Sequence, residues 1–512
     1  MVSIRRFLEW VRQHKADVAA LVVLLLVAGS VSAINMTGYP ERFEDEGTYV
    51  SQAWAIMERG TLTHYTYWYD HPPLGWIQIA GYLAATGAVD RYDSAIIAGR
   101  EFMLILHLIS VILVYALARR LKISIVAAAA GTLLFALSPL AVAFSRYVLL
   151  DNVALPWVLG AFLLALSPRR SILTAVASAA CMAVAILSKE TFAVLLPVLL
   201  YALWRNGDSR NRRYVLTAFS VVFVMISATY ILYAALKREL IPGEGHVSLI
   251  GTLLWQLFGR EGTGSIFEVG SKSRGLVSYW LNLDYWLVAL GIVGLIPALV
   301  RRSLRPVGFA LLIGLLLLLR SGYLPYPHVI MVLPFAALCA AGFIDWAIVR
   351  PLSKMDIVHG HLGKQAALCV ILAALIITSS QGIVPSWQTG LTAVNTSDDD
   401  RNSRQAVDWI STNISNDNRM VVESALWTDL QVKGYDQPNP VWLYKTETDA
   451  QVMQEIAGWQ GIDYVILNGP TVRDKDFPDA FPTVNQAVKN STLVKEFGEG
   501  KLSVLVYRVQ HD

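Results

Sequence analysis

The chain has 512 residues, of which 55% are hydrophobic and 16% are charged, and its mean hydropathy is +0.47. Soluble domains carry about 25% charged residues, so this composition excludes an ordinary soluble protein and predicts a polytopic membrane protein with a smaller soluble part. The net charge of +3 is too small to indicate nucleic-acid binding, and the 3 cysteines lie in apolar runs, which argues against a disulfide framework or a zinc site.

The N-terminal segment carries Arg5, Arg6, Arg12 and Lys15 before an apolar run at 18–34. A signal peptide has the same beginning. The many apolar segments that follow, and the lack of a clear small-residue cleavage site, favour an uncleaved first helix.

Membrane-spanning helices need about 20 mostly apolar residues, and shorter ones are tolerated inside a bundle. By this criterion we predict about eleven spans. Their ranges are 18–34, 95–118, 125–142, 153–166, 172–187, 192–203, 214–236, 285–300, 307–319, 329–349 and 365–378.

Basic clusters occur in every second loop between these spans, which is the pattern of cytoplasmic loops. The alternation holds only if 74–88 does not cross the membrane. That segment is short, contains Gln78 and is interrupted by glycines, so we expect a helix lying at the outer surface. The basic clusters are the N-terminus, 119–122, 169–170, 205–213, 301–305 and 350–364.

The remaining loops then all face outward, and they contain most of the ionisable residues near the spans. Hydropathy and Lys/Arg positions alone set this topology. Two amphipathic helices, one beginning near Glu46 and one over 250–258 with Ser248 as N-cap, are also expected on this face. The outer-face residues are Asp45, Glu46, Asp70, His71, Arg100, Arg146, Asp151, Lys189, Glu190, Arg260, Glu261, Arg274, Arg320, Tyr326 and His328.

The composition becomes polar after Pro385. The pattern predicts a small α/β domain outside the membrane, so we divide the chain into a transmembrane domain at 1–384 and an extracytoplasmic domain at 385–512. The helical patterns are 405–411 and 449–459, and the strand-like runs are 420–422, 464–467 and 503–508.

Two short acidic motifs follow the first span. Asp45 and Glu46 suit either helix capping or a general base that takes a proton from an attacking hydroxyl. Asp70 and His71, stiffened by the prolines after them, suit either an interfacial turn or a phosphate or metal contact. A divalent cation held by Asp45, Asp70 and His71 is the single cofactor candidate, and its spacing matches no established metal motif.

Cations lie at the outer ends of later spans. Each of Arg100, Arg146 and Lys189 alone suits snorkelling or an interfacial ion pair, as do the acids Asp151 and Glu190 beside them. Several cations around a few acids instead predict an anionic substrate held next to a base, because fixed positive charge stabilises a departing phosphate. Arg320, Tyr326 and His328 are candidates to complete this ring.

The ordered motifs resemble polyprenyl-phosphate-sugar-dependent glycosyltransferases of the GT-C fold, over roughly residues 17–378. The similar groups are the protein O-mannosyltransferases and the lipid A aminoarabinose transferases. A soluble domain after the last span is also similar to the architecture of the aminoarabinose transferases. The motifs are Asp45-Glu46-X-X-Tyr49, Asp70-His71-Pro72-Pro73-Leu74-Gly75, Arg100, Leu150-Asp151 and Ser188-Lys189-Glu190.

The resemblance implies a role for each matching position. Asp45 would be the catalytic base, supported by Glu46, in a single displacement that inverts the anomeric centre. His71, Arg100 and Lys189 would contact the lipid phosphate. Asp70 and Asp151 would shape the site or hold a cation, and Tyr326 would lie in the late outer loop.

The chain also departs from both groups. Aminoarabinose transferases carry Glu-Lys where this chain has Asp70-His71, and 237–274 is too short for the lumenal domain of eukaryotic protein mannosyltransferases. The acceptor therefore stays open among lipid, glycan and protein.

We therefore predict a multi-pass glycosyltransferase of the plasma (inner) membrane. It would transfer a sugar from a polyprenyl-monophosphate donor to an acceptor hydroxyl of the cell envelope, with the C-terminal domain presenting the acceptor or covering the site. The alternatives are a transporter or flippase of lipid-linked sugars, and a non-catalytic relative. Transporters place ionisable residues near the midplane and show repeats, which this sequence does not.

Overall fold

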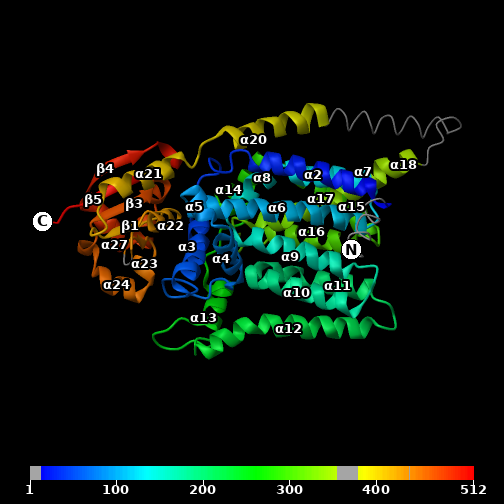
Figure 1. The fold of residues 1–512 in the computed structure, drawn as a ribbon, viewed down its shortest axis with the longest axis horizontal. Coiled ribbons are helices and arrows are strands. Elements are labelled where there is room, and N and C mark those ends of the chain that lie inside the picture. The colour runs from blue at the N-terminus through cyan, green and yellow to red at the C-terminus, as the bar shows by residue number, and fades with distance from the viewer. Residues whose placement is uncertain (1–12, 354–378, 437–438, 512) are drawn as a thin grey trace.

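The computed structural model describes residues 13–353, 379–436 and 439–511, and it consists of a long helical bundle with a mixed α/β region at one end (Figure 1). The bundle helices run side by side along the long axis of the molecule. They are α2 (Lys15–Ala33), α6 (Ala95–Arg120), α7 (Ile125–Leu137), α9 (Leu150–Ala165), α10 (Ile172–Ser188), α11 (Leu196–Asn206), α12 (Arg212–Leu236), α15 (Trp286–Val300), α16 (Arg305–Leu318) and α17 (His328–Ile344).

Shorter helices cover the end of the bundle that faces the α/β region, or connect the long ones. The segment expected as a surface helix is α4, which follows α3 at this end, and its Trp76, Ile79 and Leu83 pack inside the protein. The helix expected over 250–258 begins at Leu249 with the Ser248 side chain as its cap. The short helices are α3 (Glu44–Arg59), α4 (Leu74–Thr86), α5 (Ala88–Tyr92), α8 (Pro139–Arg146), α13 (Leu249–Leu254), α14 (Lys272–Leu283), α18 (Arg350–Ser353) and α20 (Val384–Thr396).

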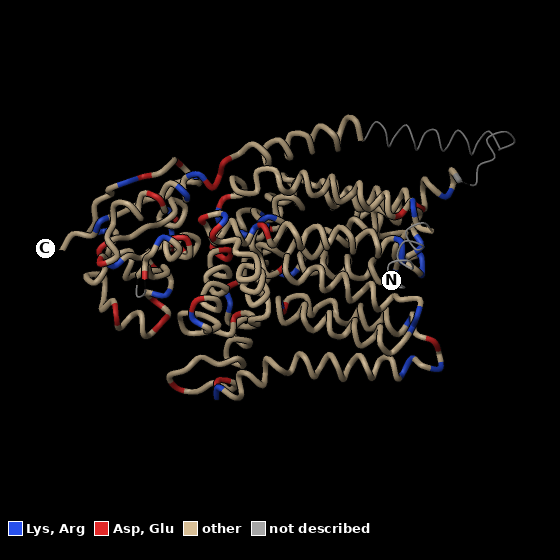
Figure 2. The backbone as a smooth tube through the Cα atoms, viewed as in Figure 1, with Lys and Arg blue, Asp and Glu red and all other residues tan. Residues whose placement is uncertain are grey.

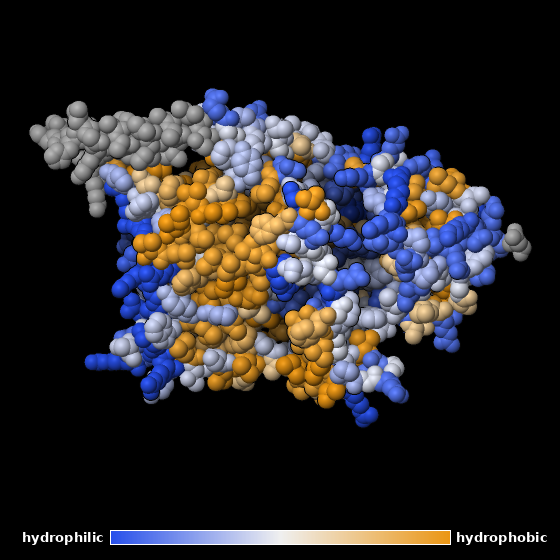
Figure 3. All heavy atoms as spheres, turned by 180° about the vertical axis from the view of Figure 1, so that it is seen from behind, coloured by the Kyte–Doolittle hydropathy of each residue, from blue (hydrophilic) through white to orange (hydrophobic). Residues whose placement is uncertain are grey.

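Apolar side chains form a band around the middle of the bundle on the face seen in Figure 3, between hydrophilic ends. Within the described residues, four helices are long and apolar enough to cross a membrane, or up to six if each bent pair is one span. The bent pairs are α7 with α8, at 57°, and α14 with α15, at 97°. The count of about eleven stays a prediction, since several helices are shorter and 365–378 lies outside the described residues.

Charged residues gather at the two ends of the bundle (Figure 2). The basic loops 119–122, 169–170, 205–213 and 301–305 lie at the end away from the α/β region, where α6 and α9 end and α12 begins. The candidate site residues lie at the opposite end.

The C-terminal region, meaning residues 397–436 and 439–511, contains a five-stranded sheet of order β2-β1-β3-β5-β4. β1 pairs in parallel with β2 and β3, whereas β5 pairs antiparallel with β3 and β4. Helices pack on both faces. The strands are β1 (Met420–Val422), β2 (Val441–Trp442), β3 (Tyr464–Asn468), β4 (Ser491–Phe497) and β5 (Val504–Val509), and the helices are α21 (Arg401–Asn413), α22 (Ser424–Val432), α23 (Lys445–Thr448), α24 (Ala450–Ile456), α25 (Gly469–Arg473), α26 (Phe477–Ala480) and α27 (Pro482–Lys489).

Buried charges join the C-terminal region to the bundle. Arg42 contacts Asp400 at 2.7 Å and Asp429 at 2.8 Å, and the three side chains are 0–2% exposed. Asp429 also accepts hydrogen bonds from the Ser94 hydroxyl and the Ala95 N–H, both at 2.8 Å, where α6 begins. The C-terminal region is therefore fixed to the end of the bundle that carries α3.

Candidate active site

The first turn of α3 presents three consecutive acids, Glu44, Asp45 and Glu46, whose charges complement the helix dipole. Phe43 precedes them in an extended conformation and supplies no side-chain cap. The three acids point in different directions around the helix, so each has its own surroundings.

Glu46 and Arg100 form a fully buried pair. Arg100 donates from Nε and Nη2 to the two Glu46 oxygens, each at 2.9 Å, and the Val148 N–H donates to Glu46 Oε1 at 3.1 Å. Arg100 Nη1 donates to the Pro40 carbonyl at 2.9 Å. In this geometry the pair holds α3 against α6, and neither side chain faces open space.

Four charged or titratable side chains form what we call the charged row: Glu190, His71, Lys189 and Asp151. His71 Nδ1 lies 3.0 and 3.1 Å from the two Glu190 oxygens, and its Nε2 lies 3.0 Å from Lys189 Nζ. Lys189 Nζ lies 4.0 Å from Asp151 Oδ2. The row thus brings together residues from the loop before α4, from the end of α10 and from the start of α9.

The charges in the row shift one another's pKa values. Burial alone would raise the pKa of Glu190, but His71 and Lys189 outweigh it and lower that pKa to about 2. Burial opposes the charged form of His71 and of Lys189, yet neighbouring carboxylates raise both pKa values, Glu190 chiefly for His71 and Asp151 for Lys189. Lys189 therefore supplies positive charge within the row, beside the imidazole of His71 and the carboxylates of Glu190 and Asp151.

Asp45 and Asp70 are half-buried, and within the described residues neither carboxylate makes a hydrogen bond or an ion pair. Both charges act to raise the pKa of Lys189, so both lie near the row. Tyr49, one helical turn after Asp45, lies against the row: its ring centroid is 5.9 Å from Lys189 Nζ and 5.9 Å from the His71 ring. An unpaired carboxylate next to a fixed cation suits a base beside an anionic leaving group.

Three other predicted site residues lie outside this group. Arg146 donates to backbone carbonyls of α2 and its C-terminal end and to Val394, and His328 Nε2 lies 2.9 Å from the Gly314 carbonyl. The Tyr326 ring stacks on Phe43 at 4.6 Å, so it borders the start of α3.

Comparisons with known proteins add to this geometry. A protein-family model described as Dolichyl-phosphate-mannose-protein mannosyltransferase matches residues 70–233, a segment that contains the charged row and begins after Asp45. A comparison with curated proteins finds no match. The crystal structure of ArnT from Cupriavidus metallidurans bound to undecaprenyl phosphate matches with a TM-score of 0.61 at 15% identity, covering 96% of this chain and 97% of that chain. The archaeal oligosaccharyltransferase AglB from Archaeoglobus fulgidus, in complex with an inhibitory peptide and a dolichol-phosphate, matches with a TM-score of 0.56 at 13% identity, covering 92% and 72%.

The chain has the GT-C fold. The family-model match and this fold confirm the class predicted from the ordered motifs, a membrane glycosyltransferase of the GT-C type.

The metal candidate of this GT-C chain has no ligand set in the described residues, where no three His, Cys, Asp or Glu side chains are grouped to hold a metal ion. His71 is occupied by Glu190 and Lys189 at both ring nitrogens. A divalent cation stays a prediction.

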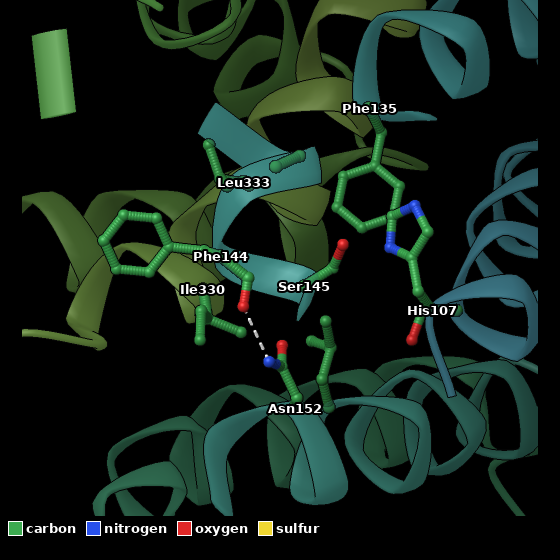
Figure 4. A pocket seen from close by; sticks show the side chains of 10 residues that line it. His107, Phe135, Phe144, Ser145, Asn152, Ile330 and Leu333 are labelled. Carbon is green, nitrogen blue, oxygen red and sulfur yellow. Dashed lines mark hydrogen bonds between the residues drawn. The ribbon is translucent and has the colours of Figure 1, made fainter. Parts of the chain in front are cut away.

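A cavity of about 20 Å³ lies inside the GT-C bundle among α6, α7, α8, α9 and α17 (Figure 4). His107, Ser145 and Asn152 line it, and Asn152 donates to the Phe144 carbonyl at 2.8 Å. Its volume suits a single water molecule and excludes a sugar or a phosphate. It is not the substrate site.

Two residues of the C-terminal region lie beside the site, and no sequence pattern indicated them. The Tyr444 hydroxyl lies 3.2 Å from Thr48 Oγ1. Lys445 is 6% exposed, with Nζ 5.5 Å from the Tyr65 ring and 5.6 Å from the Trp68 ring, and burial lowers its pKa to about 8 against the opposing charges of Asp449 and Asp70. The residues in these contacts are almost 400 positions apart in the chain, so no local pattern in the sequence predicts them.

Proposed function

We propose that this GT-C chain transfers a sugar from a polyprenyl-monophosphate donor to an acceptor hydroxyl, with inversion, and that Asp45 is the general base. One observation carries the proposal: the Asp45 carboxylate, unpaired within the described residues, lies near the positive charge of Lys189, whose Nζ is 3.0 Å from His71 Nε2. The undecaprenyl phosphate in the ArnT structure and the dolichol-phosphate in the AglB structure support this class of donor.

In the proposed step, the Asp45 carboxylate takes the proton of the acceptor hydroxyl. The acceptor oxygen then forms its bond to the anomeric carbon as the bond from that carbon to the phosphate oxygen breaks. Polyprenyl phosphate leaves with both electrons of the broken bond. Lys189 and His71 stabilise the charge that develops on it, since positive groups held in place need no reorganisation during the reaction.

We revise two roles within this proposal. We expected Arg100 at the lipid phosphate and Glu46 as support for the base. We now assign both to holding α3, because Arg100 donates hydrogen bonds to both carboxylate oxygens of Glu46. Asp70 directly precedes His71 and lies near Lys189, where it suits a contact to the sugar hydroxyls. Tyr326 suits the border of the acceptor path, since it stacks on Phe43.

We infer that the end of the bundle with Asp45 faces the outside of the plasma membrane, because the basic loops at the opposite end follow the rule for cytoplasmic loops. We assign residues 1–384 to the membrane domain and 385–512 to an extracytoplasmic domain. The five-stranded sheet with its own apolar cores supports this division.

The test compares the wild type with Asp45→Asn, purified in detergent and supplied with polyprenyl-phosphate sugars. The donor and acceptor come from mass spectrometry of cell-envelope lipids, glycans and proteins with and without the protein. We expect Asp45→Asn to lose activity by about 100-fold to 10,000-fold, the usual contribution of a general base. Asp90→Asn, on an exposed position of α5, is the matched control and should transfer normally. Near-normal turnover in Asp45→Asn would reject the base, and sugar flux into liposomes without transfer would favour a transporter.

A further inference from the structure

At Gly47 the backbone of α3 lies directly against the start of α22. A Cβ atom at this position would lie 2.3 Å from the Ala425 nitrogen and 2.3 Å from the Ser424 carbonyl carbon. Side chains do not approach backbone atoms so closely, so α3 and α22 can keep this distance only with glycine. Because glycine is less favourable than alanine inside a helix, the residue has a packing reason here.

Two hydrogen bonds flank this contact. The Ser424 hydroxyl donates to the Glu44 carbonyl at 2.8 Å, and the Tyr444 hydroxyl lies 3.2 Å from Thr48 Oγ1. The C-terminal region thus holds α3 one residue before Asp45 and again two and three residues after it.

The remaining neighbour, Glu46, is held from the opposite side by Arg100 of α6. Asp45 therefore lies between two sets of contacts, one from the bundle and one from the C-terminal region, while its own carboxylate stays unpaired among the described residues. This arrangement fixes the helix and leaves the side chain available.

The C-terminal region is also anchored too firmly to act as a lid that opens in every turnover. Opening would separate Arg42 from Asp400 and Asp429 and leave buried charges unpaired, which is strongly unfavourable. The contact at Gly47 is therefore a permanent part of the site.

We propose that the C-terminal region is a positioning element for Asp45, and that it acts through the contact of Gly47 with Ser424 and Ala425. The proposal rests on the proposed function, in which Asp45 is the base. A general base works only within hydrogen-bond reach of the proton it takes, and a displacement of about 1 Å can lower a rate about 100-fold. In the proposed function the charged row binds the donor phosphate, and the contacts of Gly47, Ser424 and Tyr444 with α3 involve no residue of that row.

The central experiment is Gly47→Ala in the full chain. We expect kcat to fall about 10-fold to 100-fold while KM for the donor stays within about twofold. Gly81→Ala is the matched control, because Gly81 also lies inside a helix at this end of the bundle and nothing lies within 4 Å of its added Cβ. Wild-type kcat in Gly47→Ala, or a rise in donor KM that accounts for the loss, overturns the proposal.

A second variant covers the case in which Gly47→Ala does not fold. Ser424→Ala combined with Tyr444→Phe removes both flanking hydroxyls without adding an atom, and we expect kcat to fall about threefold to tenfold at unchanged donor KM. Unchanged kcat in this double variant overturns the proposal.

The structure of the variant separates this proposal from the proposed function. If the wild type transfers no sugar, the proposed function fails, and electron cryomicroscopy of Gly47→Ala then tests positioning by itself. A shift of Asp45 relative to Lys189 supports the positioning role, and an unmoved Asp45 overturns it.

Discussion

Glu46 and Arg100 form a bidentate ion pair in which neither side chain is exposed to solvent. A pair of this kind is costly to break, because the remaining partner keeps a buried charge. It also distinguishes the two acids expected at the site: Glu46 is hydrogen-bonded by Arg100 and by the Val148 N–H, whereas the Asp45 carboxylate makes no hydrogen bond within the described residues.

The pair predicts a large loss of stability in Glu46→Ala. We expect the variant to be destabilised by about 3–5 kcal/mol, because Arg100 loses its buried partner. Thermal unfolding in detergent measures the effect. Glu101→Ala breaks an ion pair with the half-exposed Arg91 near the same end of α6, and its effect should stay within about 1 kcal/mol. Equal melting temperatures in the two variants would contradict the structural role of Glu46.

Lys189 should determine how well the donor phosphate departs. We expect Lys189→Ala to lower kcat by about 100-fold to 1,000-fold, as does the loss of one fixed group that stabilises developing negative charge. Inhibition by free polyprenyl phosphate should weaken in parallel. Lys433→Ala, which removes a lysine paired with the exposed Asp93, is the control. Retained inhibition by polyprenyl phosphate in Lys189→Ala would remove Lys189 from the phosphate site.

The pairing of His71 with Glu190 predicts a pH window of stability. The pKa of Glu190 is lowered from 4.5 to about 2, so its contribution is present above pH 4.5 and is lost as pH falls toward 2. The pKa of His71 is raised above 6.5, so its contribution is present below pH 6.5 and is lost as pH rises through the raised value. The difference in melting temperature between wild type and Glu190→Gln should therefore be greatest between pH 4.5 and 6.5. A difference that does not vary with pH would count against the pair.

Removal of divalent cations should leave transfer unchanged. In the proposed mechanism, Lys189 supplies the positive charge that a metal would otherwise provide, and both ring nitrogens of His71 already have partners among the described residues. The measurement is turnover in EDTA, followed by added Mg²⁺ or Mn²⁺. Loss in EDTA with recovery on addition would instead assign a cation to Asp45, Asp70 and His71.

The charge distribution predicts the orientation of the bundle. A reporter fused after Asp512 should behave as extracytoplasmic, and one inserted at 207–211 as cytoplasmic, because the basic loops stay inside. Alkaline phosphatase and green fluorescent protein fusions give opposite signals for the two locations. Alkaline phosphatase activity from the loop insertion would show that the bundle has the opposite orientation to the one predicted.

The sequence predicted local features well and distant partners poorly. Hydropathy located the long helices, and the strand-like runs at 420–422, 464–467 and 503–508 coincide with β1, β3 and β5. β2 is two residues long, and β4 is an edge strand with mostly exposed residues, so neither has an apolar alternation.

For the candidate site, too, the sequence predicted the local motifs but not the partners that are distant in the chain. Motif order and topology placed His71, Lys189 and Glu190 on one face, and the structure joins them in a row. Sequence reasoning could not distinguish an arginine that faces a phosphate from one that is paired with Glu46, because the partner is 54 residues away. The contacts of Ser424 and Tyr444 with α3 could not be predicted either, because these residues are far from α3 in the sequence.

Arg146 connects the C-terminal end of α2 to α20. It donates hydrogen bonds to the carbonyls of Ser32 and Ile34 in and after α2, and to the Val394 carbonyl of α20, the helix that leads to the C-terminal region. Its bonds to the first helix reach only the backbone. Exchanging a side chain at that helix end therefore leaves the acceptors of Arg146 in place, provided that the helix ends at the same residue, whereas replacing the arginine removes all of these bonds.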